Sequence, residues 1–212
     1  QFRESQGFRV EVIDVQDIYD EFNHGLLDPE AIRSFLTFAY ENWGKPSPSY
    51  VLLIGNGNYD FMNYKGTGEM NFIPPYLEDV DGTLGETATD NRYVCVSGDD
   101  ILPDMYLGRF PVKTFSEAQI MVEKTLFYEQ SPPVNDWNTK LTFLADNAEP
   151  GNEFVEHSDT AITYVPETYT SEKIYYDVDY SKAEARTALQ DAVNEGRLIV
   201  QYNGHGAMQY WA

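Results

Sequence analysis

Residues 198–206 read Leu-Ile-Val-Gln-Tyr-Asn-Gly-His-Gly, an apolar run that ends in a histidine between two glycines. The first five residues have the length and composition of a strand in the centre of a sheet. Gly196 stands before them as the stop signal of a helix predicted over 181–194. In a parallel sheet, this strand delivers His205 to the carboxyl edge.

The segments before this strand repeat the same order of elements. Strands are predicted over 141–146 and 173–176, and helices over 153–161 and 181–194. Strands that alternate with helices favour a mostly parallel sheet that is flanked by helices. The predicted fold class is therefore α/β, with sites expected at the carboxyl ends of the strands.

The first half of the chain predicts a similar unit. Its expected elements are strands over 8–15, 50–55, 93–96 and 105–110, and helices over 28–44 and 115–129. The chain thus opens as a β–α–β unit, for which a right-handed crossover is the default, and 56–89 is predicted as a long loop. Two prolines at 132 and 133 break the chain. We therefore predict a first α/β subdomain over 1–132 and a second over 133–212.

The composition excludes several classes of protein. The chain has 212 residues, with 14 Lys and Arg against 35 Asp and Glu, and a net charge of −21. Nucleic acids and anionic membranes are not expected as partners, because binding phosphates needs clustered cations. Aromatic residues form 15% of the chain and supply a core. No apolar run approaches the ~20 residues of a membrane span. The single cysteine excludes an internal disulfide framework and a Cys-rich zinc site.

The Gly-His-Gly segment is the sharpest candidate site. Glycines permit unusual backbone angles and leave the imidazole of His205 open to a substrate. His205 could act as a general base or orient a nucleophile, and the N–H of Gly206 could bind an oxyanion. The alternative is a turn histidine that only hydrogen-bonds to the backbone.

Asp146 follows the predicted strand that ends at residue 145 in the same way. If the two strands are neighbours, its carboxylate reaches the imidazole of His205, fixes the tautomer and supports the charged form. We expect a carboxylate oxygen within about 7 Å of an imidazole nitrogen. The alternative is a cap for the following segment, and Glu149 lies close enough along the chain to compete for the role.

Two acidic clusters resemble the sites of phosphatases or of calcium-binding proteins. Asp79 opens a segment that resembles the nucleophile loop of haloacid-dehalogenase phosphatases, and 98–104 imitates their magnesium acids. Tandem prolines at 74 and 75 cannot sit in the central strand that this chemistry needs, so a phosphatase is a distant third hypothesis. The clusters Asp79/Asp81 and Asp99/Asp100/Asp104 could bind structural calcium through oxygen ligands; solvated acidic turns are the alternative.

Cys95 is the only thiol in the chain. A Cys–His peptidase is the obvious hypothesis, but Cys95 lies inside the predicted strand 93–96 among apolar neighbours. A nucleophilic cysteine needs a partly exposed position that favours the thiolate. We therefore predict that Cys95 is a small buried core residue.

Several short segments combine into one pattern. They are Asp90-Asn91-Arg92-Tyr93, Gly98-Asp99-Asp100, Pro103-Asp104, Gly108-Arg109-Phe110-Pro111, the helix end 127–129, 144–146, and 202–206 with Trp211. As a set they resemble the gingipain-like cysteine peptidases, peptidase family C25, from about Tyr50 to the end of the chain. The resemblance implies a caspase-like α/β fold in two side-by-side subdomains, the second being catalytic, with a Cys–His dyad and a supporting acid.

The resemblance also assigns roles to residues. His205 matches the catalytic histidine, Asp146 the supporting carboxylate, and Gly206 the glycine whose amide helps to bind the oxyanion. Asp159 lies near the acid with which arginine-specific members bind a basic P1 residue. No cofactor is required by this resemblance, and the implied substrate is a polypeptide.

The family's nucleophilic cysteine follows the histidine by some tens of residues, whereas this chain continues for only seven residues after His205, and Cys95 does not match it. We therefore expect a truncated piece of a secreted or cell-surface peptidase, inactive without the remainder of its parent chain. The alternative is a non-catalytic binding or structural domain of a surface protein.

Overall fold

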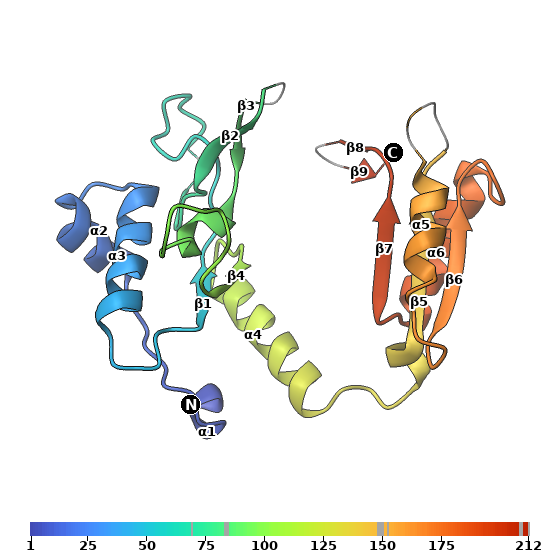
Figure 1. Cartoon of the computed structure of the whole chain (residues 1–212), viewed down its shortest axis with the longest axis horizontal. Coiled ribbons are helices and arrows are strands. Elements are labelled where there is room, and N and C mark those ends of the chain that lie inside the picture. The colour runs from blue at the N-terminus through green and yellow to red at the C-terminus, as the bar shows by residue number, and fades with distance from the viewer. Residues whose placement is uncertain (69, 83–84, 148–150, 152, 208–209, 212) are drawn as a thin grey trace. The chain divides into compact units, whose positions relative to one another are not determined.

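The computed structural model describes residues 1–212 except 69, 83–84, 148–150, 152, 208–209 and 212. The chain divides into two compact units, Gln1–Ser131 and Pro132–Ala212. Figure 1 colours the first from blue to yellow-green and the second from yellow to red. The division falls one residue before the predicted boundary. Within the described residues, no helix is long and apolar enough to cross a bilayer.

Three helices open the first unit: α1 (Phe2–Ser5), α2 (Val15–Asn23) and α3 (Pro29–Asn42). Asp28 starts α3, where its carboxylate accepts a hydrogen bond from the N–H of Glu30 at 2.9 Å. Asp14 starts α2 in the same way. These bonds satisfy donors that a helix leaves unpaired at its start. The predicted helix from Asp28 is confirmed, and α2 is an additional helix that the sequence pattern did not predict.

The first unit has a two-stranded parallel sheet of β1 (Tyr50–Ile54) and β4 (Tyr106–Phe110). Its core draws buried side chains from α2, α3 and β1: Ile18, Tyr19, Ile32, Leu36 and Leu53. On the other face of β1, Tyr50, Leu52 and Ile54 are each exposed by half or more. The strand is confirmed, but only alternate residues of it are buried, because a helix layer packs on one face.

The remaining elements of this unit are β2 (Leu77–Asp81), β3 (Gly85–Ala88), the 3₁₀ helix η1 (Asp90–Val94) and α4 (Phe115–Gln130). The predicted helix 115–129 is confirmed. Three other predictions are wrong. Residues 8–14 are exposed and form no strand, since no neighbouring strand in the described chain pairs with them, and so the unit does not open as β–α–β. The buried run around Tyr93 is helical rather than extended. The predicted loop holds an antiparallel hairpin of β2 and β3.

Arg109 joins the carboxyl ends of β1 and β4 to the segment that follows β1. Its guanidinium donates to both carboxylate oxygens of Asp90 at 2.6 and 2.8 Å. It also donates to the backbone carbonyls of Gly55, Ile73 and Pro74 at 2.9, 2.9 and 3.3 Å. These bonds engage all five N–H donors of the guanidinium. Two of the motifs quoted above therefore meet as a structural cross-link in the first unit.

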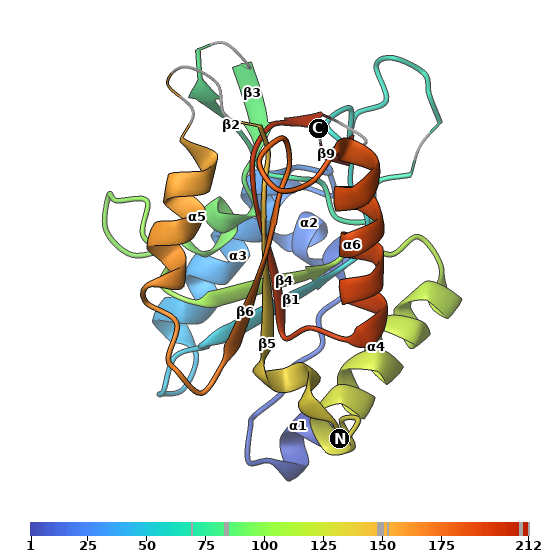
Figure 2. The ribbon, with the colours of Figure 1, turned by 90° about the vertical axis from the view of Figure 1, so that its right-hand side faces the viewer.

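The second unit is built on a parallel three-stranded sheet in the order β6-β5-β7. Its elements are η2 (Asp136–Thr139), β5 (Lys140–Ala145), α5 (Phe154–Ile162), β6 (Thr170–Tyr175), α6 (Lys182–Glu195), β7 (Ile199–Asn203), β8 (Gly206–Ala207) and β9 (Tyr210–Trp211). Figure 2 shows α5 and α6 on opposite faces of this sheet. Phe143 packs against Phe154 and Ile162 on one face, and Leu144 packs against Ala185 on the other. The predicted strands and helices of this unit are confirmed.

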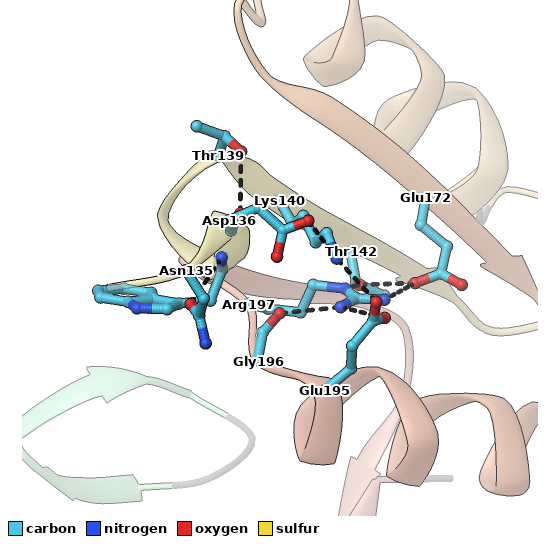
Figure 3. Close-up of polar contacts among 10 residues, drawn as sticks. Asn135, Asp136, Thr139, Lys140, Thr142, Glu172, Glu195, Gly196 and Arg197 are labelled. Atoms are coloured by element: carbon cyan, nitrogen blue, oxygen red, sulfur yellow. Dashed lines mark hydrogen bonds and ion pairs between the residues drawn. The ribbon is translucent and has the colours of Figure 1, made fainter. Parts of the chain in front are cut away.

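A polar network lies at the amino-terminal end of β5 (Figure 3). The side chain of Arg197, only 7% exposed, donates to Glu172 and Glu195 at 2.9 and 2.8 Å and to the hydroxyl of Thr142 at 3.0 Å. Lys140 adds an ion pair with Glu195 at 2.7 Å. Burying a guanidinium is costly unless its donors are paired. The network therefore ties β7, through Arg197 two residues before its start, to β5 and β6.

Candidate active site at the carboxyl ends of β5 and β7

The two predicted site residues follow neighbouring strands. β5 and β7 pair in parallel with Ala145 beside Asn203. Asp146 continues this register, because its N–H donates to the carbonyl of Asn203 at 3.1 Å. His205 stands two residues beyond Asn203. The parallel ladder therefore brings Asp146 and His205 to one edge of the sheet, as expected from the sequence.

Asp146 holds His205 at two atoms. Its Oδ2 lies 2.8 Å from the Nδ1 of His205 and accepts the backbone N–H of His205 at 3.2 Å. Its Oδ1 accepts the N–H of Asn147 at 2.8 Å. The Asp146 side chain is 2% exposed and that of His205 is 41% exposed. The expected separation of less than about 7 Å is confirmed, and the competing residue Glu149 lies outside the described residues.

The charge of Asp146 sets the tautomer of the imidazole. Burial alone raises the pKa of Asp146. Hydrogen bonds from the His205 side chain and from the N–H groups of Asn147 and His205 lower this pKa by more than burial raises it, so the net pKa lies below its ordinary value. An ionised carboxylate only accepts hydrogen bonds, so Nδ1 carries the proton that faces it. In the neutral imidazole the lone pair is then on Nε2, on the opposite side of the ring.

Gly204 is required by space rather than by backbone angle. Neither Gly204 nor Gly206 has a left-handed φ, which corrects the reason given above for the glycines. A Cβ added to Gly204 would stand 2.5 Å from the Cβ of Asp146 and 2.5 Å from the hydroxyl of Tyr202. A Cβ added to Gly206 would meet no atom of the described residues within 4 Å. The backbone of Gly204 therefore passes directly against the two side chains that border His205.

Three side chains of the site were not predicted from the sequence. The ring of Phe154 meets the imidazole of His205 edge to face, with centroids 5.0 Å apart. Asn203 fixes the start of α5 by donating to the carbonyl of Phe154 at 3.2 Å. The hydroxyl of Tyr202 donates to the carbonyl of His205 at 2.7 Å. Tyr202 and Asn203 adjoin the Gly-His-Gly segment, so their proximity was visible, whereas Phe154 gives no signal in the sequence.

Asp159 lies on α5 and is bound to β6. Its Oδ1 accepts hydrogen bonds from the ammonium of Lys173 at 2.6 Å and from the hydroxyl of Tyr175 at 2.7 Å. These bonds, chiefly that of Lys173, lower the pKa of Asp159. The carboxylate is therefore ionised and paired within the second unit, and its side chain is 47% exposed.

Cys95 belongs to the core of the first unit. It is 3% exposed, and its thiol contacts the carbonyls of Asn91 and Ile101 at 3.3 and 3.4 Å. Burial raises the pKa of this thiol. The predicted buried position is confirmed.

Two aspartates of the second acidic cluster accept hydrogen bonds from nearby backbone N–H groups. Asp104 accepts the N–H groups of Val96 and Ser97, both at 2.8 Å, and Asp100 accepts that of Leu102 at 2.9 Å. Asp79 lies in the β2–β3 hairpin rather than at the end of a central parallel strand, where a phosphatase nucleophile would stand. Among the described residues, no group of three or more His, Cys, Asp or Glu is placed to hold a metal ion.

The family comparison covers the whole chain. A sequence model of peptidase family C25 matches residues 1–212. The chain belongs to peptidase family C25. This is a family of cysteine peptidases, and the resemblance inferred from the sequence is thereby confirmed.

The C25 chain also resembles curated and solved proteins. Gingipain R2 from Porphyromonas gingivalis (strain ATCC 33277) is 24% identical over 217 residues, which cover 99% of this chain and 26% of the relative. Gingipain R1 from the same species is 24% identical and is covered to 19%. The crystal structure of the Arg-specific cysteine proteinase gingipain R matches with a TM-score of 0.66 at 21% identity, over 99% of this chain and 46% of that one. The match confirms the caspase-like α/β fold. This chain spans about a quarter or less of the length of these two curated relatives.

Proposed function

We propose that the second unit supplies the histidine half of the catalytic dyad of a gingipain-like cysteine endopeptidase, whose substrate is a polypeptide. The contact of 2.8 Å between the Nδ1 of His205 and the Oδ2 of Asp146 carries this proposal. It stands at the carboxyl edge of a parallel sheet, where α/β proteins place their sites. Membership of a cysteine peptidase family supports it independently.

In this mechanism His205 moves the proton. Its Nε2 accepts the proton of the nucleophilic thiol, so that the thiolate can attack the carbonyl carbon of the scissile bond. The imidazolium then gives that proton to the leaving amine. Asp146 supports the positive imidazolium through Nδ1. The N–H of Gly206 donates to the oxyanion of the tetrahedral intermediate.

The proposal assigns the nucleophile to a cysteine that lies beyond residue 212. Cys95 is unsuitable because its thiol is buried in the first unit. Within the described residues, β7 is the last strand of the sheet order β6-β5-β7. A further parallel strand added beside β7 would bring its own carboxyl end next to His205.

Substitution of His205 tests the proposal in the full-length protein. We expect His205→Ala to reduce the hydrolysis of peptide substrates by at least about 10³-fold. His157→Ala is the matched control, because His157 is an exposed histidine on α5 and its loss should leave hydrolysis unchanged. Hydrolysis by His205→Ala at the wild-type rate would reject the assignment. A wild-type protein that hydrolyses no peptide would favour the non-catalytic binding domain.

The proposal includes a preference for a basic P1 residue, with Asp159 as the recognising carboxylate. The solved relative gingipain R is named as an Arg-specific cysteine proteinase, and a carboxylate binds a guanidinium through two hydrogen bonds. In the present structure the carboxylate of Asp159 forms an ion pair with the ammonium of Lys173. A substrate guanidinium would therefore have to displace Lys173 or share the carboxylate with it.

A comparison of kcat/KM for Arg, Lys and neutral peptides tests the assignment of Asp159. Asp159→Ala in the full-length protein should lower kcat/KM about 100-fold for Arg and Lys peptides and leave neutral peptides unchanged. Glu156→Ala, an exposed acid on the same helix, is the control and should change none of the three. An equal effect on all peptides, or no effect, would reject Asp159 as the specificity residue.

We also propose that the protein is located outside the cytosol. The family resemblance implies a secreted or cell-surface protein that acts together with the remainder of its own chain. Fractionation of the source cells, with an antibody against this chain, should find the protein outside the cytosol. Recovery in the cytosolic fraction alone would contradict this part of the proposal.

A further inference from the structure

One peptide group links the histidine to the proposed oxyanion donor. The carbonyl of His205 and the N–H of Gly206 belong to the same planar unit. In a trans peptide these two bonds point in opposite directions. Any group that holds the His205 carbonyl therefore also sets the direction of the Gly206 N–H.

Tyr202 is the side chain that holds this carbonyl. Its hydroxyl donates to the carbonyl oxygen of His205 at 2.7 Å. Its ring packs in the cluster between the sheet and α6, together with Leu144 and Ile174. The hydroxyl reaches the carbonyl across Gly204, at a place where any Cβ on that residue would meet it at 2.5 Å. The direction of the hydrogen bond from the Tyr202 hydroxyl is thus fixed by the packing of its ring and by the lack of a side chain at Gly204.

Asp146 holds the other side of the same residue. It binds the backbone N–H and the Nδ1 of His205, while Tyr202 binds the carbonyl. Asp146 and Tyr202 therefore have different roles at His205. Asp146 orients the imidazole, which exchanges the proton, and Tyr202 orients the peptide group that follows it.

We propose that Tyr202 is a positioning residue that aims the Gly206 N–H at the oxyanion of the tetrahedral intermediate. This inference rests on the function proposed above. In this role Tyr202 acts through the peptide group that follows His205 and not on a reacting atom. Because preorganised donors act on the charge that develops in the transition state, the loss of this hydroxyl should lower kcat and spare KM.

Tyr202→Phe in the full-length protein tests the inference, since it removes the hydroxyl and keeps the ring. We expect kcat to fall about 10–100-fold with KM unchanged within about twofold. The affinity for a peptide aldehyde, whose adduct carries an oxyanion, should fall by a similar factor. The rate of alkylation by iodoacetamide, which reports the thiolate and forms no oxyanion, should not change. Tyr180→Phe, from the same cluster, is the control and should match the wild type in all three assays.

Two results would overturn the inference. One is a Tyr202→Phe variant with wild-type kcat and aldehyde affinity; the other is a parallel loss of iodoacetamide reactivity, which would place the effect on the thiolate and histidine instead. If the Phe variant does not fold, 4-fluorophenylalanine at position 202 fills the volume without donating, and the same assays decide. Failure of the proposed function is distinguishable, because hydrolysis would then be absent from the wild type or independent of His205.

Discussion

Replacing Gly204 with alanine should destabilise the second unit. The added Cβ would stand 2.5 Å from the Cβ of Asp146, 2.5 Å from the Oη of Tyr202 and 2.6 Å from its Cζ. Carbon atoms in contact normally lie about 3.5–4.0 Å apart, so each overlap approaches 1 Å. Asp146 cannot move aside cheaply, because it is 2% exposed and both of its oxygens accept hydrogen bonds.

Two effects of opposite sign decide the magnitude. Gly→Ala at a position without a left-handed φ restricts the unfolded chain and stabilises by about 0.4–1 kcal/mol. Overpacking a close contact costs about 1–3 kcal/mol. With three overlaps at once, the upper part of that range applies. We therefore expect the free energy of unfolding to fall by about 1–2.5 kcal/mol.

Urea unfolding of the 212-residue chain, followed by circular dichroism, measures this change. With an m-value of about 2 kcal/mol/M, the midpoint should fall by about 0.5–1.2 M while m stays constant. Gly206→Ala is the matched control, because its Cβ meets no atom within 4 Å in the part of the chain that the structure describes, and we expect it within about 0.5 kcal/mol of the wild type. A Gly204→Ala chain that is as stable as the Gly206→Ala chain would refute the close approach described here.

Three further predictions concern charges and the thiol. Asp146→Asn should lower kcat of the full-length protein about 10²–10⁴-fold. The lowered pKa of Asp146 stabilises the fold at pH values above its ordinary pKa of 3.8, and this contribution is lost as the pH falls through the lower folded pKa. Urea titrations should therefore show a stability difference between wild type and Asp146→Asn at pH 7 that becomes smaller as the pH falls below 3.8. Cys95 in the native chain should react with a thiol reagent at least about 100-fold more slowly than in urea, because the thiol is buried, and Cys95→Ala should leave peptide hydrolysis by the full-length protein unchanged. Arg197→Ala should lower the free energy of unfolding by about 2 kcal/mol, since it removes the buried guanidinium that forms the ion pair with Glu172. Arg186→Ala, an exposed site on α6, should change the free energy of unfolding little, and equal effects of the two would contradict the role given to the network.

The second unit could be predicted from the sequence because its signals are local. The Ser181 hydroxyl and the Glu184 carboxylate form a capping box at the start of α6. Gly196 ends that helix with a φ of 103°. Three apolar runs, which form β5, β6 and β7, alternate with α5 and α6. Each signal lies within a few residues of the element it defines, so the pattern needs no tertiary information.

The first unit was predicted less well because burial there does not follow one period. Residues 8–14 alternate as a strand does, but a strand needs a neighbour, and the sequence does not say whether one is available. Tyr93 and Val94 are fully buried in η1. A short apolar run cannot distinguish an extended segment from a helical turn.

The candidate site shows the same limit. His205 and Asp146 follow strands and are therefore visible as residues at a sheet edge. Their contact depends on the register of β5 against β7, which only the structure gives. The edge-to-face contact of Phe154 depends on how α5 packs against the sheet, and the helical pattern that predicts α5 does not give that packing.

The position of β7 at the end of the sheet order has a consequence for handling the protein. A strand with an unpaired edge is a template for pairing with another chain, and within the described residues β7 pairs with β5 alone. The net charge of −21 keeps separate copies of the 212-residue chain apart. Salt screens this repulsion beyond about 10 Å at 0.1 M. Self-association of the isolated chain should therefore increase with ionic strength, and low-salt buffers should keep it monomeric.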